Sequence, residues 1–361
     1  MDFEPPRAAG TQDSSCGRAP RPRRRAAAGL VLAGTLGLFA SQACALNIVL
    51  CNDDSIAAAN IRALKKTLQA KGHDVIVSAP ADNGSGTGGA LAFLRPIGPL
   101  TSTMRAVTAL GIPAGSAGVG TDPNEADVNY VNGSPVAACL YGLDVAAPKK
   151  WGGSPDLVIS GPNEAGSNVG AINWSSGTFN NMIYAIGRQL PVFAISDAKP
   201  GTVNWSPALP QTAHAYVVAD VAARLVDALI AHKQDAGGRL MPVGVGLNVN
   251  VPNVDDSAIG SLAFKWTRLG TSSDFMPAFF EDLSKSTYGK LLGLSGAGIA
   301  VEPGGTTLPS GVVMPTDAAP DSESNVISAK SAISVTPVQQ MPEARRVFSD
   351  AMRIKLDGFV R

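Results

Sequence analysis

Two adjacent carboxylates, Asp53 and Asp54, are the residues of this 361-residue chain whose position most favours chemistry. They directly follow the apolar run 46–51, which has the length and branched side chains of a buried strand in an α/β sheet. Neighbouring carboxylates repel each other, and burial raises their pKa unless a cation or several hydrogen-bond donors compensate. A bound divalent cation is one interpretation. The alternative is that one Asp caps a helix beginning near Ile56 while the other faces water.

Two further polar loops also come directly after predicted strands. The Gly- and Ser-rich loop 82–89 contains Ser85 and follows strand 75–77, and Asn163 follows strand 157–159. The carboxyl ends of parallel strands meet at one edge of a sheet, where ligands of α/β proteins bind. Carboxylate, hydroxyl and amide oxygens suit Mg²⁺, Mn²⁺ or Ca²⁺ better than zinc.

The segment 175–178, with the sequence Ser-Ser-Gly-Thr, immediately precedes a helix expected over 179–188. Backbone N–H groups at a helix start, with hydroxyls beside them, form a natural phosphate-binding site. The alternative is an ordinary N-cap, for which Ser and Thr are preferred.

Strands and helices alternate along the chain. After the first strand, apolar residues recur at helical spacing over 61–68, and Lys65 and Lys66 are expected to face away from the core. A helix at 213–232 and strands at 192–196 and 243–251 extend the pattern. Such alternation predicts a mostly parallel, doubly wound sheet from 46 to about 250, that is, an α/β fold.

Other parts of the chain depart from this pattern. Residues 101–130, rich in Gly, Ala and Thr, read as an inserted loop or hairpin. We expect residues 253–361 to elaborate the core 46–252, with a Gly-, Ser- and Pro-rich insert at 270–325. The same region should hold a short strand at 334–337 and a final helix at 343–359.

The first 45 residues have the pattern of an export signal. Four arginines between 21 and 25 precede a small and apolar stretch, and Ala43-Cys44-Ala45 has the small-x-small form of a cleavage site. The alternative is a disordered tail. We expect a periplasmic or secreted mature protein, with the Sec and twin-arginine routes both open. The apolar stretch is too short for stable membrane insertion. A formal net charge of +0 argues against a nucleic-acid duplex as partner.

Cleavage near Ala45 would leave Cys51 and Cys139 as the cysteines of the mature chain. A single disulfide between them is possible. Because Cys51 lies in a predicted buried strand, we favour the role of a small apolar side chain.

The motifs, in their order, resemble those of the SurE (survival protein E) family of metal-dependent nucleotidases and acid phosphatases. No single motif is specific, but their number and order are. The matching segments are 52–54, 79–86, 131–135, 160–163, 176–178, 247–252, 267–270 and 334–337.

The resemblance implies a three-layer α/β/α sandwich with a mostly parallel, Rossmann-like sheet and a C-terminal extension that serves in a homodimer or homotetramer. It implies one divalent cation, Mg²⁺ or Mn²⁺, held by Asp53, Asp54, Ser85 and Asn163. Asp53 or Asp54 would act as the base for an attacking water. Neutral donors would hold the phosphate: Asn83, Asn168, Ser176, Gly177 and Thr178.

Several positions differ from the family pattern. Ser55 stands where the family usually has Gly, and Gly84 where an Arg commonly precedes the loop serine. Glu164 and Ala165 lengthen the loop after Asn163, and Tyr184 replaces an acidic residue. All four ligand positions are kept. The resemblance therefore implies a phosphomonoesterase that hydrolyses nucleoside 5′- and 3′-monophosphates. The alternative is a catalytically weak nucleotide- or metal-binding protein of the same fold.

Overall fold

The computed structural model describes residues 45–233, 238–306, 308–311, 313, 316–340 and 352–355. The chain divides into two units, residues 1–44 and 45–361, and the described residues all belong to the second. The predicted export signal lies outside the described residues except for Ala45. Most of the predicted helix 343–359 lies outside them too, and its residues 352–355 are helical.

A nine-stranded sheet runs through the described part of the second unit, in the order β3-β4-β2-β1-β5-β6-β7-β11-β8. The six strands from β4 to β7 in this order are parallel, whereas β3 and β11 run antiparallel to β4 and β7. The strand bounds are β1 Asn47–Cys51, β2 Asp74–Pro80, β3 Val119–Asp122, β4 Glu125–Val131, β5 Leu157–Asn163, β6 Val192–Asp197, β7 Val245–Val251, β8 Phe264–Trp266 and β11 Ile333–Gln339.

The order of connection reverses beside β1. From β1 the chain continues to β2 and β4 on one side, and then returns to β5, β6 and β7 on the other. In open α/β sheets the crevice outside the carboxyl ends of the strands at such a reversal is where ligands bind. The carboxyl ends of β1 and β5, which carry Asp53 and Asn163, flank this point.

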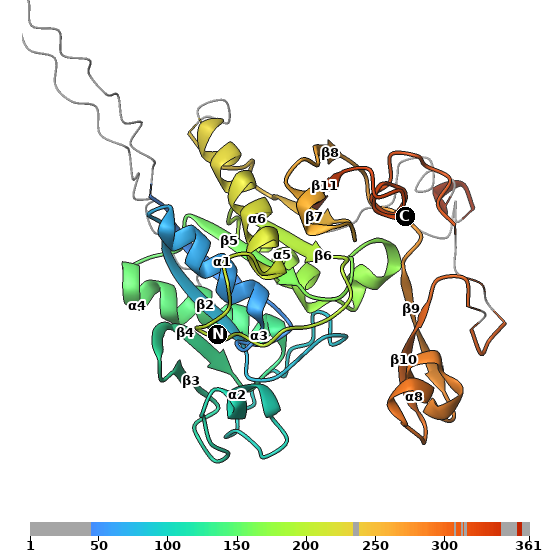
Figure 1. The fold of residues 1–361 in the computed structure, drawn as a ribbon, viewed down its shortest axis with the longest axis horizontal. Coiled ribbons are helices and arrows are strands. Elements are labelled where there is room, and N and C mark those ends of the chain that lie inside the picture. The colour runs from blue at the N-terminus through green and yellow to red at the C-terminus, as the bar shows by residue number, and fades with distance from the viewer. Residues whose placement is uncertain are drawn as a thin grey trace, which may run out of the picture. The chain divides into compact units, whose positions relative to one another are not determined.

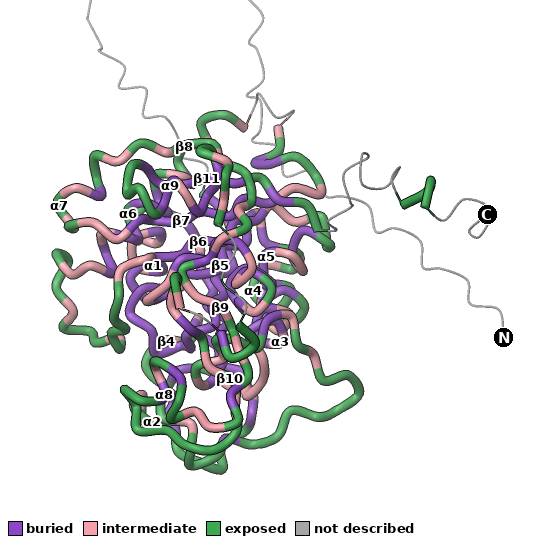
Figure 2. The backbone as a smooth tube through the Cα atoms, turned by 90° about the vertical axis from the view of Figure 1, so that its right-hand side faces the viewer, coloured by how far each residue is buried: buried purple, intermediate pink, exposed green. Residues whose placement is uncertain are grey.

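Helices cover both faces of the sheet (Figure 1), which makes a three-layer sandwich as expected. Alternate residues of β1 point to opposite faces. Ile48 and Leu50 belong to a core cluster with α1 and α6, and Val49 and Cys51 belong to a second cluster with α3 and α5. The two clusters correspond to the buried centre of Figure 2. These helices are α1 Ala59–Ala70, α3 Pro135–Tyr141, α5 Gly177–Gly187 and α6 His214–Ala231; the π-helix η1 Gly142–Ala146 and α4 Ala147–Trp151 follow α3.

The described helices include none that is long and apolar enough to cross a membrane. The helix expected from Ile56 begins at Ala59, because residues 53–57 form turns first. The predicted helix 179–188 begins earlier, at Gly177, with Ser176 as its N-cap.

The inserted region contains α2 (Arg105–Ala109) and the hairpin β3–β4, so the hairpin interpretation is confirmed. This hairpin also explains why the orientation predicted for Lys65 was wrong. The Lys65 side chain is buried, with Nζ 2.7 Å from Glu125 Oε2, and Arg62 beside it pairs with Asp122. The partners lie 60 residues away along the chain, so helical spacing alone could not reveal them. Lys66 is half-buried as a residue, but its side chain is 41% exposed, as expected.

Residues beyond Pro252 form two different structures. The first adds to the core: β11 pairs with both β7 and β8, while α7 (Asp256–Ile259) and α9 (Glu323–Ser328) pack nearby. The second is the arm, residues 275–303, which Figure 1 shows beside the core. It consists of the antiparallel pair β9 (Phe275–Phe280) and β10 (Gly298–Pro303), with the 3₁₀ helix η3 (Leu283–Lys285) and α8 (Thr287–Leu292) between them.

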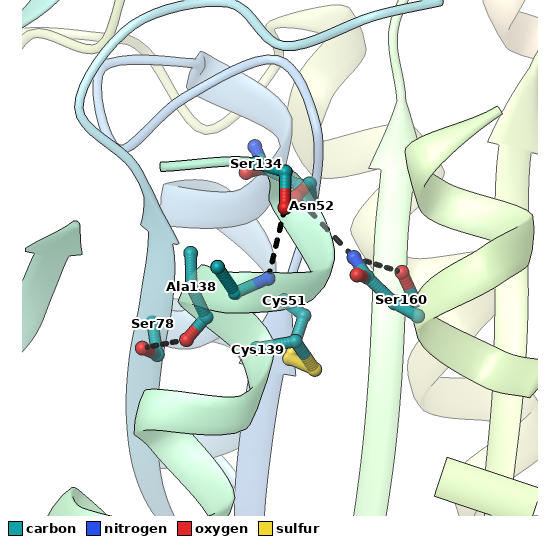
Figure 3. The surroundings of a disulfide bond; sticks show 9 residues. Cys51, Asn52, Ser78, Ser134, Ala138, Cys139 and Ser160 are labelled. Atoms are coloured by element: carbon teal, nitrogen blue, oxygen red, sulfur yellow. Dashed lines mark hydrogen bonds between the residues drawn. A yellow bond between two sulfur atoms is a disulfide. The ribbon is translucent and has the colours of Figure 1, made fainter. Parts of the chain in front are cut away.

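Cys51 and Cys139 form a disulfide (Figure 3), which corrects the apolar role favoured for Cys51. Both residues are buried, and the bond joins the end of β1 to α3 across 88 positions of sequence. The predicted burial of Cys51 is confirmed. The pairing depends on α3 lying against β1, which no local pattern shows.

Candidate active site

Asp53 lies at the N-terminus of α5. Its Oδ2 accepts a hydrogen bond from the Gly177 N–H at 3.0 Å, and its Oδ1 accepts one from Thr178 Oγ1 at 2.7 Å. Ser176 Oγ caps the helix by accepting from the Phe179 N–H at 3.0 Å. Donors that the sequence assigned to phosphate therefore hold a carboxylate of the protein itself, at the helix end that favours negative charge.

Both carboxylates are buried, and this shifts their titration. Burial raises the pKa of Asp53, although the hydrogen bonds from Thr178 and Gly177 oppose the rise. Burial raises the pKa of Asp54 well above its usual range, and the charges of Asp53 and Glu164 raise it further. Two close, buried carboxylates are costly to ionise, so a cation bound between them would stabilise their charged forms strongly.

The loop 82–89 lies directly against Asp53, because the Gly84 N–H donates to the Asp53 backbone carbonyl at 2.7 Å. Asn83 Oδ1 then accepts from the Ser85 N–H at 2.8 Å, which orients the serine. A Cβ atom at Gly84 would lie 2.8 Å from Pro135 Cδ. The place where the family commonly has Arg thus has no room for a side chain here.

Asn163 ends β5 on the other side of Asp53. Its Nδ2 donates to the Gly166 carbonyl at 2.8 Å. The Glu164 N–H donates to Asp54 Oδ2 at 3.0 Å, and the Glu164 carboxylate accepts from the backbone N–H groups of Asn60 and Val203. Glu164 thereby joins Asp54 to the start of α1. The sequence showed Glu164 only as part of a lengthened loop, and its place directly after Asn163 was the one available signal.

A cavity of about 800 Å³ opens at this edge of the sheet. It brings together Asp53, Ser85 and Asn163 among the predicted metal ligands, and Asn168 and Ser176 among the predicted phosphate ligands. The remaining predicted residues lie behind or beside this lining: Asp54, Asn83, Gly177 and Thr178. Asn168, which lines the cavity, is also hydrogen-bonded to the sheet. Its backbone N–H donates to Asn250 Oδ1, and its Nδ2 donates to Ser196 Oγ.

The donor set fits a hard divalent cation. The side chains of Asp53, Ser85 and Asn163 offer oxygen atoms from three different loops to one cavity, and an ionised carboxylate can accept more bonds than the two that Asp53 already receives. No group of three or more His, Cys, Asp or Glu residues is placed for a metal in the described part of the chain. A site here therefore depends on neutral oxygens as well as carboxylates.

Known proteins share this sequence pattern. The family model "Survival protein SurE" matches residues 48–275. An acid phosphatase of Yarrowia lipolytica is 36% identical over 214 residues, which cover 58% of this chain and 57% of that protein. A 5′-nucleotidase SurE of Gloeobacter violaceus is 32% identical over 225 residues, covering 62% of this chain and 70% of that protein.

The fold is shared as well. The crystal structure of a SurE protein from Aquifex aeolicus superimposes with a TM-score of 0.55 at 22% identity, and covers 85% of this chain and 99% of that one. At this identity the likeness concerns the fold alone. The family model, in contrast, matches more than half of the sequence and includes Asp53, Ser85 and Asn163. The chain therefore belongs to the SurE family of survival proteins.

Proposed function

We propose that this protein is a metal-dependent phosphomonoesterase that hydrolyses nucleoside 5′- and 3′-monophosphates, with acid phosphatase activity. The observation that carries the proposal is the meeting of Asp53, Ser85 and Asn163 in one cavity at the point where the strand order reverses. The names of the relatives, acid phosphatase and 5′-nucleotidase, support this class of reaction.

Mg²⁺ or Mn²⁺ is the proposed cofactor, held by Asp53, Asp54, Ser85 and Asn163. When bound, it would supply the positive charge that stabilises negative charge developing on the phosphoryl oxygens. The protein contributes the rigid placement of its ligands. Gly177 and Thr178 hold both oxygens of the Asp53 carboxylate, so little reorganisation is needed when substrate binds.

In this proposal the paired carboxylates accept the proton of the attacking water. Asp53 lines the cavity, which places its carboxylate within reach of a water that attacks the phosphorus atom. Asp54 is not among the residues that line the cavity, and the Glu164 N–H donates to one of its oxygens. We assign the base to Asp53 and a supporting charge to Asp54. Ser176 and Asn168 line the same cavity and would donate to the phosphate oxygens.

Asp53→Asn tests the assignment. The substitution should lower phosphate release from adenosine 5′-monophosphate, with added Mn²⁺ or Mg²⁺, by roughly 100-fold or more, because a ligand and a base are both lost. The fold should survive, since removal of a buried charge offsets the weakened hydrogen bonds to α5. Asp127→Asn is the matched control, because Asp127 lies at the surface and pairs with Lys150. Full metal-dependent turnover by Asp53→Asn would show that the assignment is wrong.

The alternative is a catalytically weak protein that binds nucleotide or metal without turnover. It predicts Mn²⁺ binding by calorimetry, abolished by Asp53→Asn, together with no phosphate release by the wild type at any pH. Phosphate release at normal enzymatic rates would exclude it.

We also propose export to the periplasm or the exterior, and assembly into a homodimer or homotetramer. The buried disulfide supports export, because structural disulfides persist in oxidising compartments. An exported protein whose N-terminus begins near Leu46 would agree with this proposal, and retention of the intact chain in the cytoplasm would contradict it. Light scattering of the purified protein measures the assembly.

A further inference from the structure

The cavity beside Asp53 has a second wall, which comes from the arm. Phe275, Tyr288, Leu292 and Val301 line it, and all four belong to β9, α8 or β10. The walls differ in chemistry, because the strand ends offer hydroxyls, amides and carboxylates whereas the arm offers two rings and two aliphatic side chains. A phosphate ion has no apolar surface that could pack against the second wall.

The two rings form a pair with exposed surface. The centroids of Phe275 and Tyr288 lie 6.2 Å apart with their planes inclined at 52°, and both side chains are only partly buried. Partly buried rings that face a cavity leave apolar surface in water, which a planar ligand would cover favourably.

Phe275 lies close to the proposed reaction centre. Its Cε2 is 3.6 Å from the position that a Cβ atom would take at Gly166. Gly166 in turn accepts, through its carbonyl, the hydrogen bond from the Asn163 amide. The ring therefore borders the loop that carries a predicted metal ligand, at ordinary van der Waals distance from the Cβ position of Gly166.

The size of the cavity agrees with a ligand larger than phosphate. About 800 Å³ lies in the range of sites for whole cofactors and drug-sized molecules. Asn253 and Lys330 also line the cavity. Asn253 offers a hydrogen-bond donor and an acceptor to the edge of a bound ring, and Lys330 offers a positive charge.

We propose that Phe275 and Tyr288 determine the specificity of this protein by stacking against the base of a nucleoside monophosphate while the strand ends hold its phosphate. This inference rests on the proposed function and adds the residues that select the leaving group. Stacking on aromatic side chains tolerates both purines and pyrimidines, so we expect selection for an aromatic ring rather than for one base.

The test compares two substrates that differ only in the base. Adenosine 5′-monophosphate and ribose 5-phosphate are assayed for kcat/KM with wild type, Phe275→Ala, Phe275→Leu and Tyr288→Leu. Each variant should lose roughly tenfold in kcat/KM for adenosine 5′-monophosphate, mostly in KM, and should keep its rate with ribose 5-phosphate within about twofold. The Leu variants retain apolar volume, so they separate loss of the ring from a packing defect.

Phe279→Ala is the matched control. Phe279 lies on the same strand, β9, is 65% exposed, and does not line the cavity. It should leave the rates with both substrates unchanged. Equal losses with the two substrates, or an equal effect of Phe279→Ala, would overturn the proposal, since either result would mean that the arm acts only on folding.

Calorimetric binding of adenosine, which has no phosphate, separates this proposal from the proposed function. Binding that Phe275→Ala weakens would support the ring pair even if the protein released no phosphate. Phosphate release from adenosine 5′-monophosphate and ribose 5-phosphate with equal kcat/KM, together with no adenosine binding, would support the proposed function and overturn the role of Phe275 and Tyr288.

Discussion

Ser55 has the largest positive φ among the non-glycine residues that the structure describes. Its φ is 108°, a region that suits glycine, which is the residue the family usually has there. Two hydrogen bonds maintain the conformation: Ser55 Oγ accepts from the Ala57 N–H at 3.2 Å, and the Ser55 carbonyl accepts from Asn52 Nδ2 at 2.8 Å. The turn that directly follows Asp53 and Asp54 is therefore made with a strained residue.

Replacing Ser55 with Gly should raise the free energy of unfolding by about 1 kcal/mol, because relief of strain outweighs the lost side-chain hydrogen bond. Thermal or urea unfolding measures the effect. Ser206→Gly is the matched control, since Ser206 Oγ accepts the same kind of bond, from the Ala208 N–H at 3.2 Å, without a positive φ. The control should lower stability. Destabilisation by both substitutions would show that Ser55 is not strained.

The sequence could predict which residues meet at the site, because their positions are determined by where the strands end. Asp53 and Ser85 follow parallel strands and Asn163 ends one, so their meeting in one cavity follows from the topology. The direction in which a side chain points was not predictable. Gly177 and Thr178 have the sequence of a phosphate site, yet their donors are directed at Asp53.

Among the elements, α3 packs against two segments of the site. It begins at Pro135, whose ring lies where side chains at Gly84 or Gly177 would have to go. The disulfide from Cys139 holds this helix against the end of β1, two residues before Asp53. Pro135 of α3 packs against both the loop 82–89 and the start of α5, and this packing sets the distance between them.

Removing the disulfide with Cys51→Ala and Cys139→Ala together should lower the free energy of unfolding by about 4 kcal/mol, because the bond closes a long loop in the unfolded chain. Urea unfolding with and without reducing agent measures this. The wild type should lose similar stability when reduced during unfolding, and the double variant should not respond to reductant. An equal response of both proteins would mean that the cysteines are not paired in solution.

At the scale of the whole molecule, Glu323 joins the C-terminal region to the site. This carboxylate is fully buried, and burial raises its pKa while its hydrogen bonds oppose the rise. It accepts four hydrogen bonds, at 2.9 to 3.3 Å, from the Gly170 N–H, Asn173 Nδ2, Asn248 Nδ2 and Thr336 Oγ1. Two of these donors lie in the 3₁₀ helix Gly170–Trp174, which leads directly into Ser176.

Glu323→Gln should lower the free energy of unfolding by about 2 to 3 kcal/mol, because an amide NH₂ would then face buried donors. It should also lower kcat, since the segment before Ser176 loses its anchor. Chemical unfolding and phosphate release measure the two effects. Glu281→Gln, at an exposed position of the arm, should change neither. Unchanged stability of Glu323→Gln would contradict the anchoring role.

The overall architecture was predictable from sequence because alternating strands and helices with short connections allow few other arrangements. Contacts distant in sequence were not. The burial of Lys65 depends on Glu125, the contribution of the arm to the cavity wall depends on where Phe275 lies, and the pairing of Cys51 depends on α3. Each requires the fold to be known first, because no local pattern of residues specifies it.

The position of β11 in the sheet determines when, during synthesis, the sheet can be completed. This strand, Ile333–Gln339, is the last described strand along the chain, yet it lies inside the sheet between β7 and β8. A ribosome must therefore release the chain through β11 before β7 gains this neighbour and Thr336 can reach Glu323. Translation products that stop before β11 would lack the contact that anchors the segment before Ser176, so only chains that include β11 can assemble the complete site.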